Sequence, residues 1–356
     1  MIIMLRQWCR QGGSAIIFDM TMVLGIDAGG TSTRAALFTL EGAPVRRGRA
    51  GGANPGALGG DVAAANLAAA VRAVLVDGVA SQVKSVVAGV AGNPEACAAL
   101  AGRVLPELLP GAAIASVGDL VTAFAAGTAA PSGSVLISGT GAIAAKITER
   151  RPTAIADGFG WLLGDEGSAF WLGHAAARAA IRALSPTGPS SGPSSGPSSG
   201  PSSRVAQGFP GGEGLVELVV RELAPEGPGP DPVARLAAAV HARPPLALAE
   251  LAPLVSRAAA AGDPLAVEIV REAAARLAAT LRAVHGSGPV VLAGSVLTSA
   301  GPVRQAVTDL LAGAIGAGAI RTAGDVAGAA AWLAARPSLG PHEAEARHPR
   351  FVRALT

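Results

Sequence analysis

One pattern occurs twice in this chain: a buried strand, a turn rich in glycine and hydroxyl residues, and a second strand. The first copy is VLGIDAGGTSTRAALF at 23–38, and the second is GSVLISGTGAIAAKITE at 133–149. Two copies about 110 residues apart indicate an internal duplication. Strand and helix patterns alternate after the first copy, which favours an α/β sheet in each half.

The length supports two lobes, because 356 residues exceed what one hydrophobic core usually organises. A repeated Gly-Pro-Ser-Ser segment interrupts the second half; it cannot bury a core and is predicted to be disordered. Its simplest interpretation is an expansion within a surface loop, with a functional role left open. The predicted parts are an N-terminal extension at 1–21, a lobe at 22–122, a lobe at 123–336 with the low-complexity insert at 185–212, and a loose tail at 337–356.

Composition excludes several classes of protein. The formal charge is only +3 and no large basic cluster is present, so nucleic acid is not an expected partner. No apolar run is long enough to span a bilayer, and the N-terminus lacks the apolar core of a signal peptide. Cys9 and Cys97 are far apart, which disfavours a disulfide framework, a zinc site or an iron–sulfur site and suits the cytoplasm.

The first glycine turn has the residues of a phosphate-binding loop. Asp27 ends a hydrophobic strand, and Gly29, Gly30 and Thr31 follow it. Glycine lets backbone N–H groups approach an anion closely, hydroxyls add donors, and the carboxylate could hold a metal ion or its waters. An ordinary hairpin is the alternative, since Gly-Gly is common in such turns.

The second turn strengthens the phosphate interpretation. Thr140 and Gly141 again place a hydroxyl beside glycine after a buried strand. Two such turns, one from each half, could face each other and hold a polyphosphate across a cleft. Neither lysine follows a glycine and no GxGxxG occurs, so binding would depend on amides, hydroxyls and a divalent cation.

Two further places could carry chemistry. Asp119 ends a predicted strand and begins a helix, where it is either a helix cap or the acceptor of a proton from a substrate hydroxyl. The run DGFGWLLGDEGSAFWLG at 157–173 is rich in aromatic residues, glycines and acids. It is either a capped helix with aromatic packing or a sugar site, in which a ring stacks and carboxylates bind hydroxyls.

These motifs together resemble the BadF/BadG/BcrA/BcrD-type ATPases, and within them the N-acetylglucosamine kinase group. The resemblance runs from about residue 22 to 335, through GIDAGGTSTRAALF, SGTGAIAAKI, GFGWLLGDEGSAFWLG and VLAGSVLTSAGPV. It implies a two-lobed actin-like ATPase (ribonuclease H-like) α/β fold, with duplicated βββαβαβα domains around a central cleft. It further implies ATP and Mg²⁺ as cofactors, a small-molecule sugar substrate and a homodimer.

The resemblance also implies roles for individual residues. Asp27 would organise the magnesium, and Asp119 would be the general base on the sugar 6-hydroxyl. Phosphate contacts fall on Gly29, Gly30, Thr31, Thr140 and Gly141. Sugar contacts fall on Asn54, Gly158, Phe159, Gly160, Trp161 and Asp165. The adenosine pocket would be lined by Gly262, Gly294, Ser295 and Ser299.

Two departures from the family pattern leave the sugar open. Ala142 stands where a serine usually follows the second loop, and Phe159 stands where tryptophan is usual. Glucosamine, N-acetylmuramic acid and glucose are therefore alternatives to N-acetylglucosamine. A non-catalytic sugar sensor and a dehydratase-activating ATPase are alternatives of another class, but the first usually carries a helix-turn-helix and the second needs closely placed cysteines.

Overall fold

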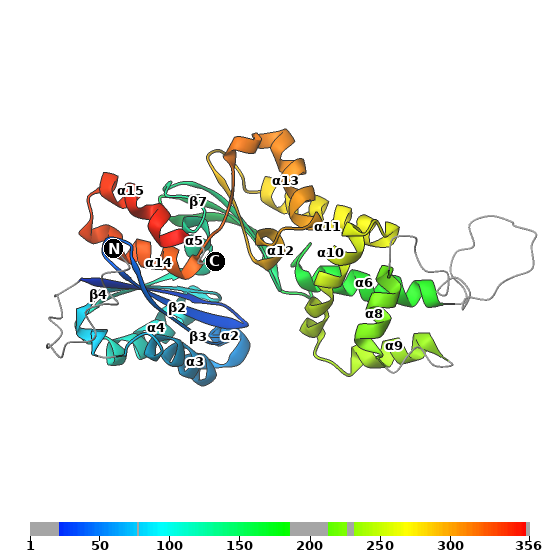
Figure 1. Cartoon of the computed structure of the whole chain (residues 1–356), viewed down its shortest axis with the longest axis horizontal. Coiled ribbons are helices and arrows are strands. Elements are labelled where there is room, and N and C mark those ends of the chain that lie inside the picture. Colours follow the sequence, from blue (N-terminus) through cyan, green and yellow to red (C-terminus); the bar gives the residue numbers. More distant parts are fainter. Residues whose placement is uncertain (1–20, 77, 186–212, 226–230, 354–356) are drawn as a thin grey trace, which may run out of the picture. The chain divides into compact units, whose positions relative to one another are not determined.

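The chain forms two compact units that repeat one topology. The computed structural model describes residues 21–76, 78–185, 213–225 and 231–353 (Figure 1). One unit comprises the described residues up to Ser116 with Ala331–Phe351, and the other comprises those of Val117–Ala330 with Val352 and Arg353. The division after Ser116 lies near the predicted one after residue 122. The predicted extension at 1–21 and the predicted insert at 185–212 lie outside the described residues except for Thr21 and Ser185.

The first unit is built on a five-stranded mixed sheet in the order β3-β2-β1-β4-β5. The central strand β1 pairs with β2 in antiparallel register and with β4 in parallel register. Its strands are β1 (Met22–Ala28), β2 (Ser32–Thr39), β3 (Pro44–Gly51), β4 (Val83–Val90) and β5 (Ala113–Gly118).

The second unit repeats this arrangement with the order β10-β9-β6-β7-β8. Strand β6 pairs antiparallel with β7 and parallel with β9, as β1 does with β2 and β4. Both predicted glycine turns therefore connect equivalent strands, and the predicted duplication is confirmed. The strands are β6 (Gly133–Ser138), β7 (Ala142–Thr148), β8 (Arg151–Asp157), β9 (Val290–Ala293) and β10 (Ile320–Thr322).

Helices cover both faces of the first sheet. On one face α3 (Gly60–Arg72) and α4 (Pro94–Leu108) pack against the buried side chains of alternate residues of β1. On the other face lies α15 (Pro341–Val352), whose Phe351 ring is centred 5.0 Å from that of Phe38 on β2 (Figure 1). The prediction of a loose tail at 337–356 is wrong, because this helix buries apolar side chains that cover the sheet. The short α2 (Pro55–Leu58) and η2 (Val79–Gln82) complete this part.

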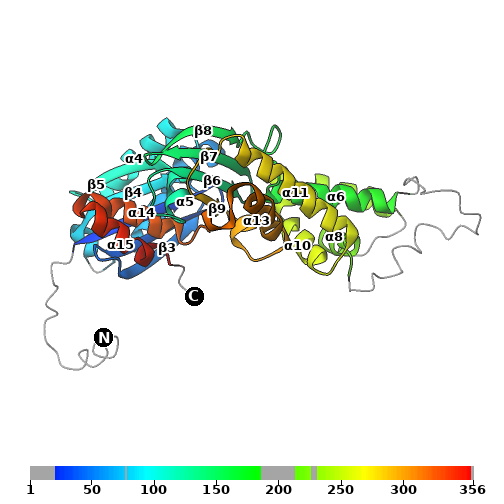
Figure 2. The same ribbon diagram turned by 90° about the horizontal axis from the view of Figure 1, so that it is seen from above.

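In the second unit, α6, α8, α10 and α11 gather into one bundle (Figure 2). Two of its described helices begin where the sequence places an acid directly before proline, at Asp231 and Asp263, whose carboxylates accept backbone N–H groups. Its helices before β9 are α5 (Asp119–Ala125), α6 (Ala169–Leu184), α8 (Leu215–Leu223), α9 (Pro232–His241), η3 (Pro245–Leu251), α10 (Ala252–Ala260) and α11 (Pro264–Arg282). The later helices are α12 (Ser295–Thr298), α13 (Pro302–Ile315), η4 (Ala317–Ala319), α14 (Val326–Ala335), which continues into the first unit, and η5 (Arg336–Ser338). None of the helices in the described ranges is long and apolar enough to cross a membrane.

Candidate functional site

The first glycine turn is a tight loop between β1 and β2. The Gly29 N–H donates to the Ser32 carbonyl at 3.0 Å, and the Ala53 N–H donates to the Gly29 carbonyl at 2.9 Å. Because a trans peptide directs its N–H opposite to its carbonyl, the Gly30 N–H points away from Ala53. Gly30 and Thr31 are exposed at the tip. The Gly30 N–H is thus directed away from the strand ends at the exposed tip, as a phosphate-binding loop requires of its donors.

Asp27 lies beside this loop at the end of β1. Its side chain is 21% exposed, and the guanidinium of Arg34 lies 3.8 Å from its Oδ2. Within the described residues, no three His, Cys, Asp or Glu side chains gather as a metal-binding group. A single carboxylate suits Mg²⁺ that is bound mainly through phosphate and water, because Mg²⁺ keeps several waters and needs few protein ligands. Asp27 therefore fits the predicted role, which stays a prediction.

The second glycine turn is held from behind by helix α6. The N–H groups of Ala169 and Phe170, in the first turn of this helix, donate to the carbonyls of Gly139 and Thr140 at 2.8 and 3.3 Å. These bonds satisfy amides that a helix start leaves unpaired. Since both carbonyls face α6, the N–H groups of Thr140 and Gly141 point away from it, side by side. Two adjacent amides with one direction form an anion-binding concavity.

The run at 157–166 forms a loop between β8 and the start of α6, and it contacts this second turn. Asp165 is only 8% exposed, and its Oδ1 accepts the Ala142 N–H at 3.1 Å. Burial raises the pKa of Asp165, and the nearby charge of Asp157 raises it further. The predicted sugar contact of Asp165 stays a prediction, but the structure places its carboxylate against the second glycine turn.

The aromatic residues of the same loop are exposed. Phe159 is 69% exposed, and Trp161 packs on Phe170 with ring centres 5.4 Å apart. Gly158 and Gly160 have positive φ angles of 81° and 83°, which let the loop turn sharply on both sides of Phe159. An exposed ring beside glycine backbone can stack on a sugar. Phe159 and Trp161 are accessible to such a ligand, and the sugar contacts at 158–161 stay a prediction.

Sequence reasoning missed Asp157 in this loop. Its Oδ1 accepts the Gly158 and Asp165 N–H groups at 2.8 and 2.7 Å, and its Oδ2 accepts the Glu166 N–H at 2.8 Å. The sequence signal was an acidic residue directly before glycine at the end of a strand, a common start for a side-chain-supported turn.

Asp119 is the first residue of α5, in the second unit. Its Oδ1 accepts the adjacent Leu120 N–H at 3.0 Å. Burial raises the pKa of Asp119, and backbone hydrogen bonds from Leu120 and from its own amide only partly oppose that rise. A carboxylate with a raised pKa is a stronger proton acceptor than an ordinary aspartate.

Asn54 begins helix α2 in the first unit, and its two amide atoms have different roles. Its Oδ1 accepts the N–H groups of Gly56 and Ala57 at 2.9 and 3.2 Å, which is a helix cap. The oxygen is therefore committed to the fold, and the Nδ2 group is the one suited to donate to a ligand. Such a donor recognises a carbonyl or a hydroxyl oxygen.

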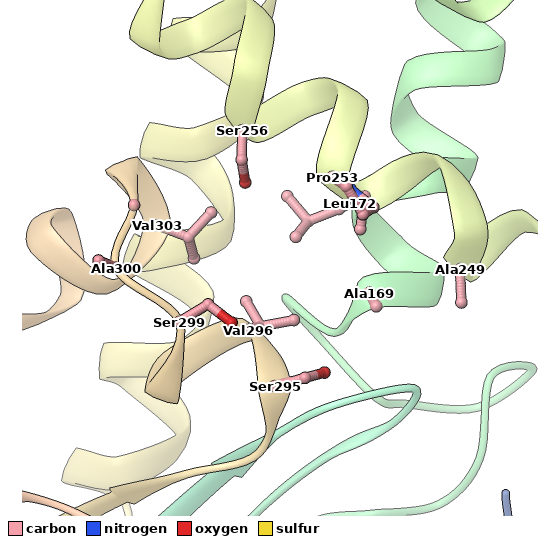
Figure 3. A pocket seen from close by; sticks show the side chains of 12 residues that line it. Ala169, Leu172, Ala249, Pro253, Ser256, Ser295, Val296, Ser299, Ala300 and Val303 are labelled. Carbon is pink, nitrogen blue, oxygen red and sulfur yellow. The ribbon is translucent and has the colours of Figure 1, made fainter. Parts of the chain in front are cut away.

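A cavity of about 340 Å³ lies near the second turn (Figure 3). Gly294 fits directly behind that turn, because a Cβ there would lie 2.3 Å from the Ser138 carbonyl oxygen and 2.9 Å from the Gly139 nitrogen. The next residue, Ser295, and then Ser299 line the cavity, and their predicted contact with adenosine stays a prediction. Gly262 is not among the lining residues; it follows α10 with a φ of 88°.

The other walls of the cavity include residues to which sequence reasoning gave no individual role. Helix α6 contributes Ala169 and Leu172, and η3 with α10 contributes Ala249, Pro253 and Ser256 (Figure 3). The walls are small and apolar with three serine hydroxyls, a lining typical of a site for a flat, largely apolar ring. These positions could not be found from motifs because they are ordinary residues of amphipathic segments.

Comparison with known proteins gives one family and several similar structures. The model of the BadF/BadG/BcrA/BcrD ATPase family matches residues 24–331. A candidate N-acetylglucosamine kinase of Chromobacterium violaceum aligns with a TM-score of 0.62 and 23% identity over 89% of this chain and 99% of its own. A second, of Porphyromonas gingivalis, gives 0.59 and 19% over 92% and 98%. A glucokinase of the ROK family of Streptomyces griseus, bound to glucose and AMPPNP, gives 0.50 and 17% over 88% and 99%. These likenesses establish the two-lobed actin-like fold, and no curated protein sequence matches the chain.

Proposed function

Because the chain belongs to the BadF/BadG/BcrA/BcrD ATPase family, we propose that it is an ATP-dependent kinase that phosphorylates an amino sugar. The γ-phosphate is transferred to the 6-hydroxyl, and the acceptor is N-acetylglucosamine. The candidate N-acetylglucosamine kinases among the similar structures support the choice of this acceptor.

The observation that carries the proposal is the junction of the second turn with the cavity behind it. The turn offers two parallel amides, and Gly294 packs against its backbone where the cavity lining begins. A nucleotide needs this combination, because its phosphates require donors and its base requires a slot with few charges.

The transfer needs a proton acceptor and a group that neutralises phosphate charge. Asp119 takes the proton of the acceptor hydroxyl while that oxygen bonds to the γ-phosphorus, and the bond from this phosphorus to the bridging oxygen breaks to release ADP. Asp27 would hold a Mg²⁺ ion or its waters beside the first turn, and that ion would supply the charge neutralisation. The amides of both turns position the phosphate groups.

Asn54 selects the acceptor through its amide nitrogen. Its oxygen caps α2, so the side chain presents N–H donors. The acyl carbonyl of an N-acetyl sugar is a matching acceptor, whereas the ammonium group of glucosamine is a donor and would repel it. N-acetylglucosamine is therefore favoured over glucosamine.

A coupled ADP-release assay tests the proposal with N-acetylglucosamine, glucosamine, N-acetylmuramic acid and glucose at equal concentration. The highest kcat/KM is expected for N-acetylglucosamine. Failure of all four sugars would contradict the kinase assignment, and a preference for glucosamine would contradict the role of Asn54.

Asn54→Asp is a matched variant for that role. The carboxylate keeps the oxygen that caps α2 but loses the donor, so the fold should persist. We expect KM for N-acetylglucosamine to rise roughly 10-fold, the effect of one hydrogen bond, while KM for ATP stays constant. Asn54→Ala removes both functions and serves as the reference for a lost cap.

A further inference from the structure

The loop at 157–166 is closed by one carboxylate. Asp157 adopts a left-handed conformation, with a φ of 64°, and its two oxygens accept N–H groups from both ends of the loop: Gly158 at one end, Asp165 and Glu166 at the other. Gly164 leaves room for it, since a Cβ there would lie 2.1 Å from Asp157 Oδ1. Hydrogen bonds to a charged acceptor are stronger than those between neutral groups, so this carboxylate fixes the shape of the loop.

The same loop is fastened to the second glycine turn by Asp165. Its carboxylate accepts the Ala142 N–H, and a Cβ on Gly141 would come within 2.7 Å of Asp165 Oδ2. The Asp165 carbonyl also accepts the Ser168 N–H at 3.1 Å, just before α6. Asp157 orients the Asp165 backbone, and Asp165 in turn contacts the turn backbone that carries the two parallel amides.

We propose that Asp157 is a positioning residue that couples the exposed aromatic loop at 158–164 to the second glycine turn. The inference rests on the proposed function, in which the loop binds the acceptor sugar and the turn binds phosphate. Asp157 and Asp165 hold the loop at a fixed position relative to the turn. A sugar stacked on the loop therefore lies at a fixed distance from a phosphate bound by the turn. This alignment is what a near-attack geometry requires.

Substitution of Asp157 should therefore separate acceptor use from nucleotide binding. Asp157→Asn leaves one acceptor oxygen and turns an NH₂ group towards a backbone N–H, so one end of the loop is released. KM for the acceptor is expected to rise about 10- to 100-fold, as for a lost hydrogen bond to a charged group. The affinity for ADP, measured by calorimetry, should fall by less than the acceptor KM rises, because Ala169 and Phe170 still hold the carbonyls of the turn.

Asp157→Gly tests whether the backbone shape alone is needed. Glycine accepts a φ of 64° without strain but has no carboxylate. We expect an acceptor KM at least as high as that of Asp157→Asn; a wild-type acceptor KM in Asp157→Gly would overturn the proposal. Asp231→Asn is the matched control, since Asp231 also accepts a backbone N–H in this unit but lies at the start of α9. Asp231→Asn should change neither the acceptor KM nor the affinity for ADP.

Hydrogen exchange gives a readout that does not depend on activity. In Asp157→Asn, peptides covering 158–166 and peptides covering 139–142 should both exchange faster than in the wild-type protein. Faster exchange confined to 158–166 would overturn the coupling. If the wild-type protein phosphorylates no sugar, the proposed function fails, while the exchange result still decides whether the loop and the turn are coupled.

Discussion

The two glycine turns occupy equivalent places in two copies of one topology, yet they are supported differently. The first turn is tied to its surroundings by backbone bonds from Gly29 and Ala53, and its tip is exposed. The second turn has helix α6 behind it and the Asp165 carboxylate against Gly141. Duplication thus preserved the strands, and the segments inserted after them determine how firmly each turn is held.

This difference suggests separate tasks for the two turns. A turn whose carbonyls are fixed by a helix presents its amides without further ordering, so a bound phosphate incurs little entropic cost there. A turn with an open tip can adjust to the phosphates but must be ordered by them. We therefore expect the second turn to contribute more to nucleotide affinity than the first.

The largest expected effect comes from a residue in neither turn. Asp119→Asn removes the proposed proton acceptor and should lower kcat roughly 10²- to 10⁴-fold, the usual range for a lost general base. Calorimetry should show ADP affinity unchanged, because both turns are intact. A kcat close to that of the wild-type protein would rule out Asp119 as the proton acceptor and leave it as the first residue of α5 only.

The pH dependence of kcat should report the same group. Burial raises the pKa of Asp119, so the rate should fall, as pH is lowered, at a higher pH than an ordinary aspartate would give. A raised folded-state pKa favours the native state in acid, and this contribution is lost as pH rises through that pKa. Asp119→Asn should therefore melt at a higher temperature than wild type at neutral pH, with the difference vanishing below the pKa of the unfolded state. A lower melting temperature at neutral pH would contradict the desolvation account.

Alanine at one glycine of each turn tests the comparison directly. A Cβ on Gly141 would lie 2.7 Å from Asp165 Oδ2 and 2.9 Å from Asp165 Cγ, whereas a Cβ on Gly30 has no atom within 4 Å. Gly141→Ala should cost about 1–3 kcal/mol of unfolding free energy, as overpacking does. Gly30→Ala should stay within about 0.5 kcal/mol, typical of an open surface site.

Chemical denaturation of both variants measures these costs. The double variant Gly141→Ala/Asp165→Ala should tolerate the added methyl group better than Gly141→Ala does, because the carboxylate that it meets is gone. Equal losses of unfolding free energy in Gly30→Ala and Gly141→Ala would contradict the proposed difference, since they would mean that both turns are equally constrained.

Much of the fold could be predicted from the sequence because the duplicated strands are apolar and end in glycine. The family resemblance implied a third strand, but the residue pattern alone did not show β3, because this strand lies at the sheet edge and is largely exposed, with Arg46, Arg47 and Arg49 in place of an apolar pattern. Helix α15 was missed inside a polar tail, although Ala344, His348 and Phe351 have helical spacing and are buried.

The site was predicted less completely, for a physical reason. Motifs gave Asp119 and both glycine turns, since these residue types present charges and bare backbone at strand ends. The direction of the Asp165 side chain depends on Ala142, 23 residues earlier, and no local pattern encodes that contact. The cavity walls at Ala249 and Pro253 likewise arise only when separate helices pack together.

The smallest expected effect concerns the hydroxyls of the two turns. Thr140 has its carbonyl fixed by the Phe170 N–H, while Thr31 lies at an exposed tip. A hydroxyl on fixed backbone contributes nearly its full hydrogen bond to phosphate, so Thr140→Val should weaken ADP binding roughly 10-fold. Thr31→Val should weaken it less, because part of that bond is offset by ordering the tip. Thr140→Ser and Thr31→Ser retain the hydroxyl and should bind ADP as the wild-type protein does. A larger loss at Thr31 than at Thr140, measured by calorimetry, would reverse the assignment of the second turn as the firmer phosphate holder.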